Sequence, residues 1–297
     1  MDEYINKFID YLKYQRRYSS YTCNSYYEDL LFFKDYLNKE NISFKDLEYS
    51  DIRIFFGYLD SKKYSKNTIS RKLSSIRSFY KYLSRNSYIN SNPFIVPTSI
   101  KRDKLIPKFL YYNELEDLFN VCDINTLFGL RDRLLLELLY ATGMRVGEIE
   151  YLKIKDIDED NMCIKVLGKG SKERFVYFGE YVLDYLSCYL NMRDDTCPYL
   201  FINKNKERLT SRGIRLIINK CVTKASLNTK ISPHTLRHTF ATHLINEGCD
   251  LLSIKELLGH SSLKTTEVYT HITSDALKNT YLRSHPRSHK SIEENRK

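Results

Sequence analysis

The stretch from His234 to Tyr269 contains one arginine, one tyrosine and four histidines, of which His234 and His260 are the candidates for chemistry. His234 and Arg237 are three residues apart on a predicted helix that Ser232 can cap and Pro233 can open. Residues at this spacing project from one helix face. An imidazole and a guanidinium side by side are suited to holding an anionic group.

The second candidate histidine and the tyrosine follow after a glycine. Gly259 can end the next predicted helix, which leaves His260 at the turn. Tyr269 is one of 25 tyrosines, so it is selected by its position, in a polar run (261–270) that is not expected to bury a ring. A free phenol has a pKa near 10 and needs a base or cations nearby to attack at neutral pH. We therefore expect Tyr269 to attack a phosphodiester held by the basic groups.

Two further basic residues fit the same chemistry. A phosphodiester resists attack, so enzymes place fixed cations on its oxygens and an acid at its leaving oxygen. Arg145 follows a helix-stopping glycine, Gly143, and its planar fork can donate two hydrogen bonds to phosphate. Lys169 lies at a glycine-flanked hairpin tip. Alone, each is more simply a salt-bridge arginine or a solvated turn lysine; their occurrence together with the histidines and the tyrosine favours phosphoryl chemistry.

Hydrophobic periodicity indicates the elements that position these residues. The first hundred residues are predicted to be helical, at about 4–14, 20–39, 50–61 and 67–85. The remainder is predicted to contain helices and one hairpin of two strands, at about 128–142, from 146, 162–167, 174–178, 180–193, 210–226 and on to about 282. The fold class is therefore mainly α with a small antiparallel β-sheet in the C-terminal domain.

Prolines interrupt this periodicity at positions 93, 97 and 107 and indicate a linker. The expected organisation is a helical DNA-binding domain (1–90), a linker (91–107), a catalytic domain (108–284) and a basic C-terminal tail (285–297).

The net charge of +10 is concentrated in one stretch. Residues 61–102 contain ten basic and no acidic residues, and the rest of the chain is balanced at 37 of each. A localised basic region of this kind indicates nucleic-acid binding. On the helix predicted at 67–85, a basic and serine-rich face lies opposite the apolar stripe and suits phosphates. The candidate DNA-binding residues are Lys66, Arg71, Ser74, Arg77, Ser78, Lys81 and Arg85.

Metal, nucleotide and membrane functions find less support. His234 and His238 have the spacing of a zinc pair, but Thr235 stands where a zinc hydrolase has glutamate, so we expect no metal and no cofactor. The seven scattered cysteines do not indicate a disulfide framework. No nucleotide-binding P-loop and no apolar run of membrane-spanning length occurs in the sequence, so we expect no membrane partner.

The residues also resemble a known family. The segments that carry the likeness are 141–145, 168–174, 232–244, 257–262, 265–271 and 285–287, with 65–68 and 77–83 in the N-terminal part. They resemble the tyrosine recombinase (phage integrase) family and, within it, the bacterial Xer recombinases. The resemblance covers nearly the whole chain. It implies a two-domain, C-shaped clamp formed by a core-binding domain and a catalytic domain.

The resemblance implies a role for each candidate residue. Tyr269 would be the nucleophile that forms a 3′-phosphotyrosyl bond. The scissile phosphate would be bound by Arg145 and Arg237, and Lys169 would protonate the departing 5′-hydroxyl. His234 and His260 would assist in proton transfer and phosphate contact, and Glu148 would support Arg145.

It also implies partners and a setting. The partner would be double-stranded DNA with a specific recombination site, bound by a homo- or hetero-tetramer on two sites that exchanges strands through a Holliday junction. The C-terminal segment after about Ser274 would be exchanged between subunits. The expected process is resolution of chromosome dimers at a dif-like site during segregation and cell division, in the cytoplasm at the nucleoid, with a septal DNA translocase as a further partner.

The residues leave four competing functions open. Gly147 stands where Xer proteins usually have serine, which leaves open an integrase or excisionase of a mobile element. A DNA-relaxing topoisomerase of the same chemistry, a catalytically silent DNA-binding protein and a metal-dependent phosphodiesterase are the remaining three.

Overall fold

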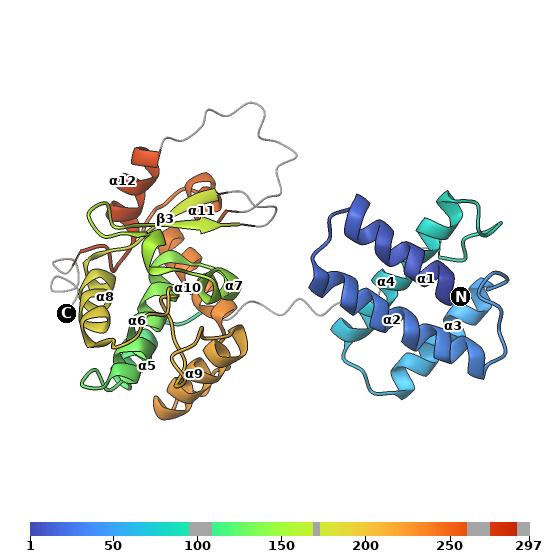
Figure 1. The fold of residues 1–297 in the computed structure, drawn as a ribbon, viewed down its shortest axis with the longest axis horizontal. Helices are drawn as coiled ribbons and strands as arrows, with labels where there is room; N and C mark the ends of the chain where they lie inside the picture. The colour runs from blue at the N-terminus through green and yellow to red at the C-terminus, as the bar shows by residue number, and fades with distance from the viewer. Residues whose placement is uncertain (95–108, 169–172, 260–273, 290–297) are drawn as a thin grey trace. The chain divides into compact units, whose positions relative to one another are not determined.

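The computed structural model describes residues 1–94, 109–168, 173–259 and 274–289 (Figure 1). The chain divides into two compact units, Met1–Leu105 and Ile106–Lys297. The fold is mainly helical with one small antiparallel sheet, which confirms the predicted fold class. Among the described helices, none has the length and apolar character needed to cross a membrane.

The N-terminal unit consists of helices around an aromatic core. Its elements are α1 (Asp2–Asp10), which continues into a π-helical turn (Tyr11–Gln15), α2 (Ser20–Lys39), α3 (Tyr49–Ser61) and α4 (Lys66–Arg85). Phe33 of α2 meets Phe55 of α3 edge to face at 4.9 Å between ring centroids. Phe8 of α1 meets Phe79 of α4 in the same way at 5.5 Å. These ring pairs connect α2 with α3 and α1 with α4, and they fix which face of α4 remains at the surface.

The second unit surrounds one central helix with shorter helices and the sheet (Figure 1). Its elements are α5 (Tyr112–Asn120), α6 (Leu127–Thr142), α7 (Val146–Glu150), a 3₁₀ turn (Ile154–Asp156), β1 (Ile157–Asp158), β2 (Cys163–Leu167), β3 (Glu173–Tyr177), α8 (Glu180–Met192), α9 (Ser211–Lys224), α10 (Pro233–Asn246), α11 (Leu251–Leu258) and α12 (Ser274–Ser284). The predicted hairpin is β2 and β3, paired antiparallel with Ile164 opposite Val176. The short strand β1 was not predicted; it pairs with β2 at its first two residues.

The central helix, α6, explains how the arginines are brought together. Every residue from 130 to 142 is buried, and α5, α8 and α10 pack around the helix. The helix ends as predicted at Gly143, which adopts the left-handed conformation with φ of +59°. A Cβ there would lie 2.8 Å from both Phe240 and Leu258. The glycine therefore lets the chain turn tightly against α10 and α11, immediately before Arg145.

The C-terminal segment packs on its own unit. Helix α12 contacts α11 and β3, and Tyr281 is fully buried. Residues 285–288, which were expected to begin a basic tail, are also buried, with Arg287 only 3% exposed. They fit there because Gly179 has no side chain: a Cβ on it would lie 2.1 Å from the Arg287 carbonyl oxygen. In the single chain, Tyr281 and residues 285–288 therefore pack on their own unit.

Candidate active site

Arg145 is positioned by the helix that it begins. It is the residue before α7, and its backbone N–H donates to Glu148 Oε2 at 2.8 Å. Its guanidinium donates to Glu148 Oε1 at 3.1 Å and to the Gly259 carbonyl at 3.2 Å. The side chain remains 37% exposed. Glu148 thus fixes both ends of Arg145 while leaving part of the guanidinium open to a ligand.

Arg237 reaches the same place from α10, the helix that Ser232 caps and Pro233 opens as predicted. Its Nη1 donates to the Gly143 carbonyl at 2.5 Å and its Nη2 to the Leu258 carbonyl at 2.6 Å. Burial, with the neighbouring positive charge of Arg145, lowers the pKa of Arg237 to about 10. At neutral pH the group therefore stays protonated, and an anion brought to it would relieve the unfavourable charge.

The two guanidiniums converge at the end of α11. Arg237 binds the carbonyl of Leu258, and Arg145 binds the carbonyl of the next residue, Gly259. Gly259 ends α11 in the left-handed conformation, as predicted, with φ of +61°. Segments far apart in sequence therefore place two fixed cations together, which is the arrangement that phosphate binding requires.

A third arginine braces this pair. Arg174 on β3 donates to both oxygens of Glu148, at 2.8 and 3.0 Å. A Cβ on Gly259 would lie 2.7 Å from the Arg174 side chain, so the glycine also makes room for this arginine. Burial acts to raise the pKa of Glu148, but the hydrogen bonds and charges of Arg174 and Arg145 lower it overall. Glu148 therefore holds a negative charge between two arginines, and Arg174 is a member of the site that sequence reasoning missed.

The remaining predicted residues lie partly outside the described chain. His234 is exposed on the first turn of α10, three residues before Arg237. Lys169, His260 and Tyr269 lie outside the described residues. Their sequence neighbours are described: Gly259, which ends α11 directly before His260, and β2 and β3, which flank Lys169.

The predicted DNA-binding face belongs to α4. Five members of the set are exposed, namely Lys66, Arg71, Ser74, Lys81 and Arg85, and the other two, Arg77 and Ser78, are half-buried. The hydroxyl of Ser74 donates to the carbonyl of residue 70 at 2.8 Å, so in this rotamer it is not a donor to phosphate.

One residue of the basic stretch belongs to the core. Lys72 is 8% exposed, and its ammonium lies 4.0 Å from the centroid of the Phe32 ring. Its charge is therefore part of the fold and not of the surface.

A buried carboxylate orients Arg71. Asp29 of α2 is 1% exposed and accepts hydrogen bonds from Arg71 at 2.5 Å, Ser75 at 3.0 Å and Lys72 at 3.2 Å. Asp29 therefore neutralises part of the positive charge of α4, and the Arg71 side chain is 46% exposed. Sequence reasoning missed this residue because nothing in the pattern of α2 pairs it with a helix 43 residues later.

We expect Asp29→Asn to lower the free energy of unfolding by about 3 kcal/mol, because it leaves two cations beside a neutral amide in a buried site. Urea unfolding of the full chain followed by circular dichroism measures this. Asp35→Asn, an exposed position on the same helix, is the matched control and should change stability by less than about 0.5 kcal/mol. Equal stability of the two variants would contradict the structural role of Asp29.

Comparison with known proteins identifies the family of both units. Residues 108–275 match the model of the phage integrase family, and residues 5–87 match that of the phage integrase N-terminal SAM-like domain. The chain is 45% identical over 296 residues to the tyrosine recombinase XerC of Bacillus licheniformis, covering 97% of both chains. It is also 45% identical over 296 residues to the tyrosine recombinase XerC of Bacillus subtilis, again covering 97% of each.

Two solved structures also match the fold of this chain. The XerH site-specific recombinase bound to its difH substrate matches with a TM-score of 0.68 and 26% identity, over 93% of this chain and 83% of that chain. The Tn1549 transposon integrase in complex with circular-intermediate DNA has the same fold, with a TM-score of 0.73 at 20% identity, over 93% of this chain and 98% of that chain. With family models matched in both units and relatives aligned almost end to end, the chain belongs to the phage integrase family and is a site-specific tyrosine recombinase.

Proposed function

We propose that Arg145 and Arg237 hold the non-bridging oxygens of a scissile DNA phosphate while Tyr269 attacks its phosphorus. The observation that carries this assignment is the convergence of the two guanidiniums on the consecutive carbonyls of Leu258 and Gly259. Both cations are fixed before the substrate arrives, so they need little reorganisation as charge develops on the phosphate.

The chemical step conserves the energy of the broken bond. The Tyr269 oxygen forms a bond to phosphorus, the bond from phosphorus to the 5′-oxygen breaks, and a 3′-phosphotyrosyl ester remains. In this proposal Lys169 gives a proton to the departing 5′-oxygen, and His234 and His260 assist in proton transfer and phosphate contact. The 5′-hydroxyl of a partner strand reverses the step, so neither a metal nor a nucleotide is required.

Glu148 has a supporting role in the same proposal. It touches no substrate atom but binds Arg145 through both its backbone and its side chain, and Arg174 holds it in place. Because burial opposes its charge, Glu148 depends on these arginines, and they depend on it for orientation.

For the biological substrate, we propose a dif-like chromosomal site. Support comes from the XerC relatives at 45% identity and from the XerH complex with difH. On this site, a tetramer joining two DNA duplexes would exchange strands through a Holliday junction to resolve chromosome dimers at the nucleoid. The second recombinase, if the tetramer is mixed, and a septal translocase would be its protein partners. The exposed basic residues of α4 would contact the flanking phosphates.

Exchange of the C-terminal segment between subunits is also part of this proposal. For this exchange, either the buried residues between 281 and 288 would leave their own unit, or a different part of the C-terminal segment would be exchanged.

A nicked suicide substrate tests the chemistry. We expect the wild-type protein to form a covalent adduct with DNA and Tyr269→Phe to bind the same DNA while forming none, because phenylalanine has no nucleophilic oxygen. Tyr111→Phe, at a tyrosine 64% exposed on the surface, is the matched control and should form the adduct normally. An adduct that persists in Tyr269→Phe would remove Tyr269 as the nucleophile.

Footprinting of the bound DNA tests the substrate. A protected site in the chromosome supports dimer resolution, whereas a protected site at the end of a mobile element would assign the same chemistry to integration.

A further inference from the structure

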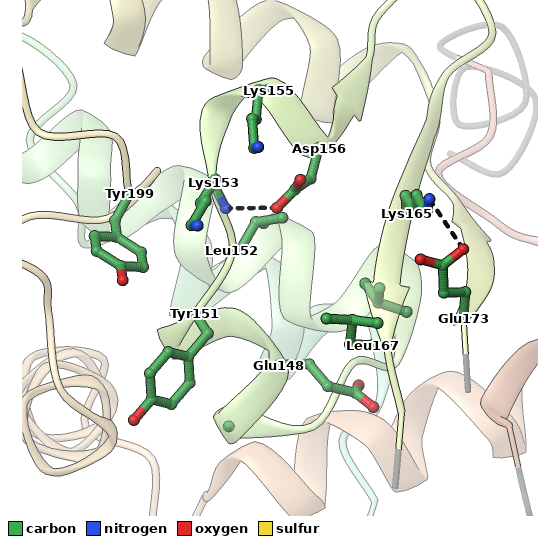
Figure 2. A pocket seen from close by; sticks show the side chains of 12 residues that line it. Glu148, Tyr151, Leu152, Lys153, Lys155, Asp156, Lys165, Leu167, Glu173 and Tyr199 are labelled. Atoms are coloured by element: carbon green, nitrogen blue, oxygen red, sulfur yellow. Dashed lines mark hydrogen bonds and ion pairs between the residues drawn. The ribbon is translucent and has the colours of Figure 1, made fainter. Parts of the chain in front are cut away.

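A groove of about 660 Å³ opens next to the candidate active site in the second unit (Figure 2). It lies between the segment that follows α7 and the strands β2 and β3. Figure 2 shows Glu148 and Leu167 toward one end of the groove and Lys155 toward the opposite end. Glu148 is the residue that binds Arg145, so this end of the groove lies beside that arginine.

Among the charged residues that line the groove, two lysines, Lys153 and Lys155, are candidates to bind a ligand. Each acid already has a partner: Glu148 is held by Arg145 and Arg174, Asp156 accepts the backbone N–H of Lys153 at 3.2 Å, and Glu173 pairs with Lys165 at 2.9 Å. The ammonium of Lys153 lies 5.9 Å from the centroid of the Tyr199 ring. The ion pairs within and beside the groove thus occupy Glu148 and Glu173 and leave the ammonium groups of Lys153 and Lys155, with the carboxylate of Asp156 near them, as the remaining charges of the lining.

The walls of the groove also include two tyrosines, Tyr151 and Tyr199, and the end of β2. Tyr151 is 56% exposed, and the Arg208 guanidinium stacks on its ring at 4.0 Å. Tyr199 also lines the groove, and Figure 2 shows its ring beside Lys153. Hydroxyl groups and lysines together are the side chains that contact phosphate and sugar in DNA complexes.

We propose that this groove binds the DNA backbone next to the scissile phosphate, with Lys153 and Lys155 contacting successive phosphates. The proposal rests on the proposed function, because it takes the phosphate at Arg145 and Arg237 as the starting point. A strand anchored there and running past Glu148 would enter the groove at its Leu167 end and leave it past Lys155.

Charge favours DNA over a peptide as the occupant. Residues 165–167 of β2 lie beyond the pairing with β1, which ends at Ile164, so an extended peptide adding to this edge is the competing occupant. Lys165 on this edge is exposed, and lysines on an edge strand oppose pairing with a further strand. The groove therefore suits a polyanion better than a peptide.

The test measures binding of a duplex that carries a single recombinase half-site. For Lys153→Gln/Lys155→Gln, we expect affinity to fall about tenfold and the salt dependence of log K to become shallower by about two, since each lost phosphate contact removes about 0.9 from the slope. Lys153→Arg/Lys155→Arg keeps both charges and should retain the slope. The matched control, Lys220→Gln/Lys224→Gln, removes two exposed lysines of α9 that line a different cavity.

A second measurement uses the wild-type protein and does not depend on how the variant folds. Methylphosphonates that neutralise single phosphates beside the cleavage position should weaken wild-type binding, and should not weaken binding of the double glutamine variant further. An unchanged slope and affinity in the double variant, or an equal loss in the control, would overturn the proposal. Normal half-site binding with a defect only when two sites are joined would also overturn it and assign the groove to a protein segment.

The suicide substrate separates this inference from the proposed function. If the wild-type protein forms the adduct while the double variant binds as the wild type does, the groove assignment fails and the chemistry stands. If the wild-type protein forms no adduct on a bound site, the chemistry itself fails.

Discussion

Arg237→Lys is expected to lower the single-turnover rate of DNA cleavage by about 10²–10³-fold, the usual cost of losing a fixed donor to a developing oxyanion. Arg237 uses two nitrogens to bind the carbonyls of Gly143 and Leu258, and the positive charge of Arg145 lies nearby. One ammonium cannot bind both carbonyls and also meet a phosphate. DNA affinity should change only a few-fold, because it is spread over many phosphates.

The remaining activity of this variant should depend on pH in a defined direction. Burial and Arg145 lower the pKa of Arg237 to about 10, which still leaves the arginine charged at neutral pH. The ordinary pKa of lysine is about two units below that of arginine. The same surroundings would therefore bring the pKa of a lysine at this position much closer to neutral pH. Its charged form is favoured by acid, and Arg237→Lys should therefore cleave relatively faster as the pH falls.

Single-turnover cleavage between about pH 6 and pH 9, divided by the wild-type rate at each pH, measures this effect. Arg215→Lys, an exposed arginine on α9, serves as the matched control and should follow the wild type throughout. A rate equal to wild type at the alkaline end would show that Arg237 does not act through a fixed charge on the phosphate.

Local sequence signals were sufficient for the parts of the site that depend on neighbouring residues. Ser232 and Pro233 begin α10, and Gly143 and Gly259 end α6 and α11 in the left-handed conformation, all as predicted. These positions set the helix ends from which Arg145 and Arg237 project. Capping and glycine chemistry act within a few residues, so a single sequence contains them.

The missed residues all depend on tertiary contacts. Asp29 meets Arg71 across two helices, and Arg174 on β3 meets Glu148 on α7. The burial of Arg287 differs from the expectation of a solvated basic tail at 285–297, which was drawn from the charge of these residues. In each case the partner is distant in sequence, and neither periodicity nor charge count identifies it.

Arg287→Ala is expected to destabilise the second unit by about 3–5 kcal/mol, because it removes one partner of a buried charge pair. Its guanidinium lies between two carboxylates, with Nη1 3.3 Å from Glu137 Oε1 and Nη2 bonded to Glu116. It also lies over the rings of Phe119 and Tyr181, at 4.7 and 4.5 Å from their centroids. Alanine would lose these contacts and leave Glu137, which is fully buried, with Arg133 as its one cation among the described contacts.

The effect should be partly reversed in two ways that follow from the charge of Glu137. Burial raises the pKa of Glu137, and the charges of Arg287 and Arg133 oppose that rise. Without Arg287, the pKa rises further, so the folded state takes up a proton more readily than the unfolded state and the lost stability returns as the pH falls towards about 4.5. Adding Glu137→Gln supplies a neutral side chain at once, and the double variant should be more stable than the sum of the single effects predicts.

Urea unfolding of the four proteins of this cycle, at neutral and mildly acidic pH, measures both effects. Arg283→Ala, an exposed arginine one turn earlier, should stay within about 0.5 kcal/mol of the wild type at both values. Additive losses, or a loss that does not shrink in acid, would mean that Arg287 stabilises the C-terminal segment through Glu116 and its ring contacts and not through Glu137. A coupled, pH-dependent loss would instead mean that the segment around Arg287 is fixed to α6 by charge, and that the proposed exchange between subunits would require this buried pair to open.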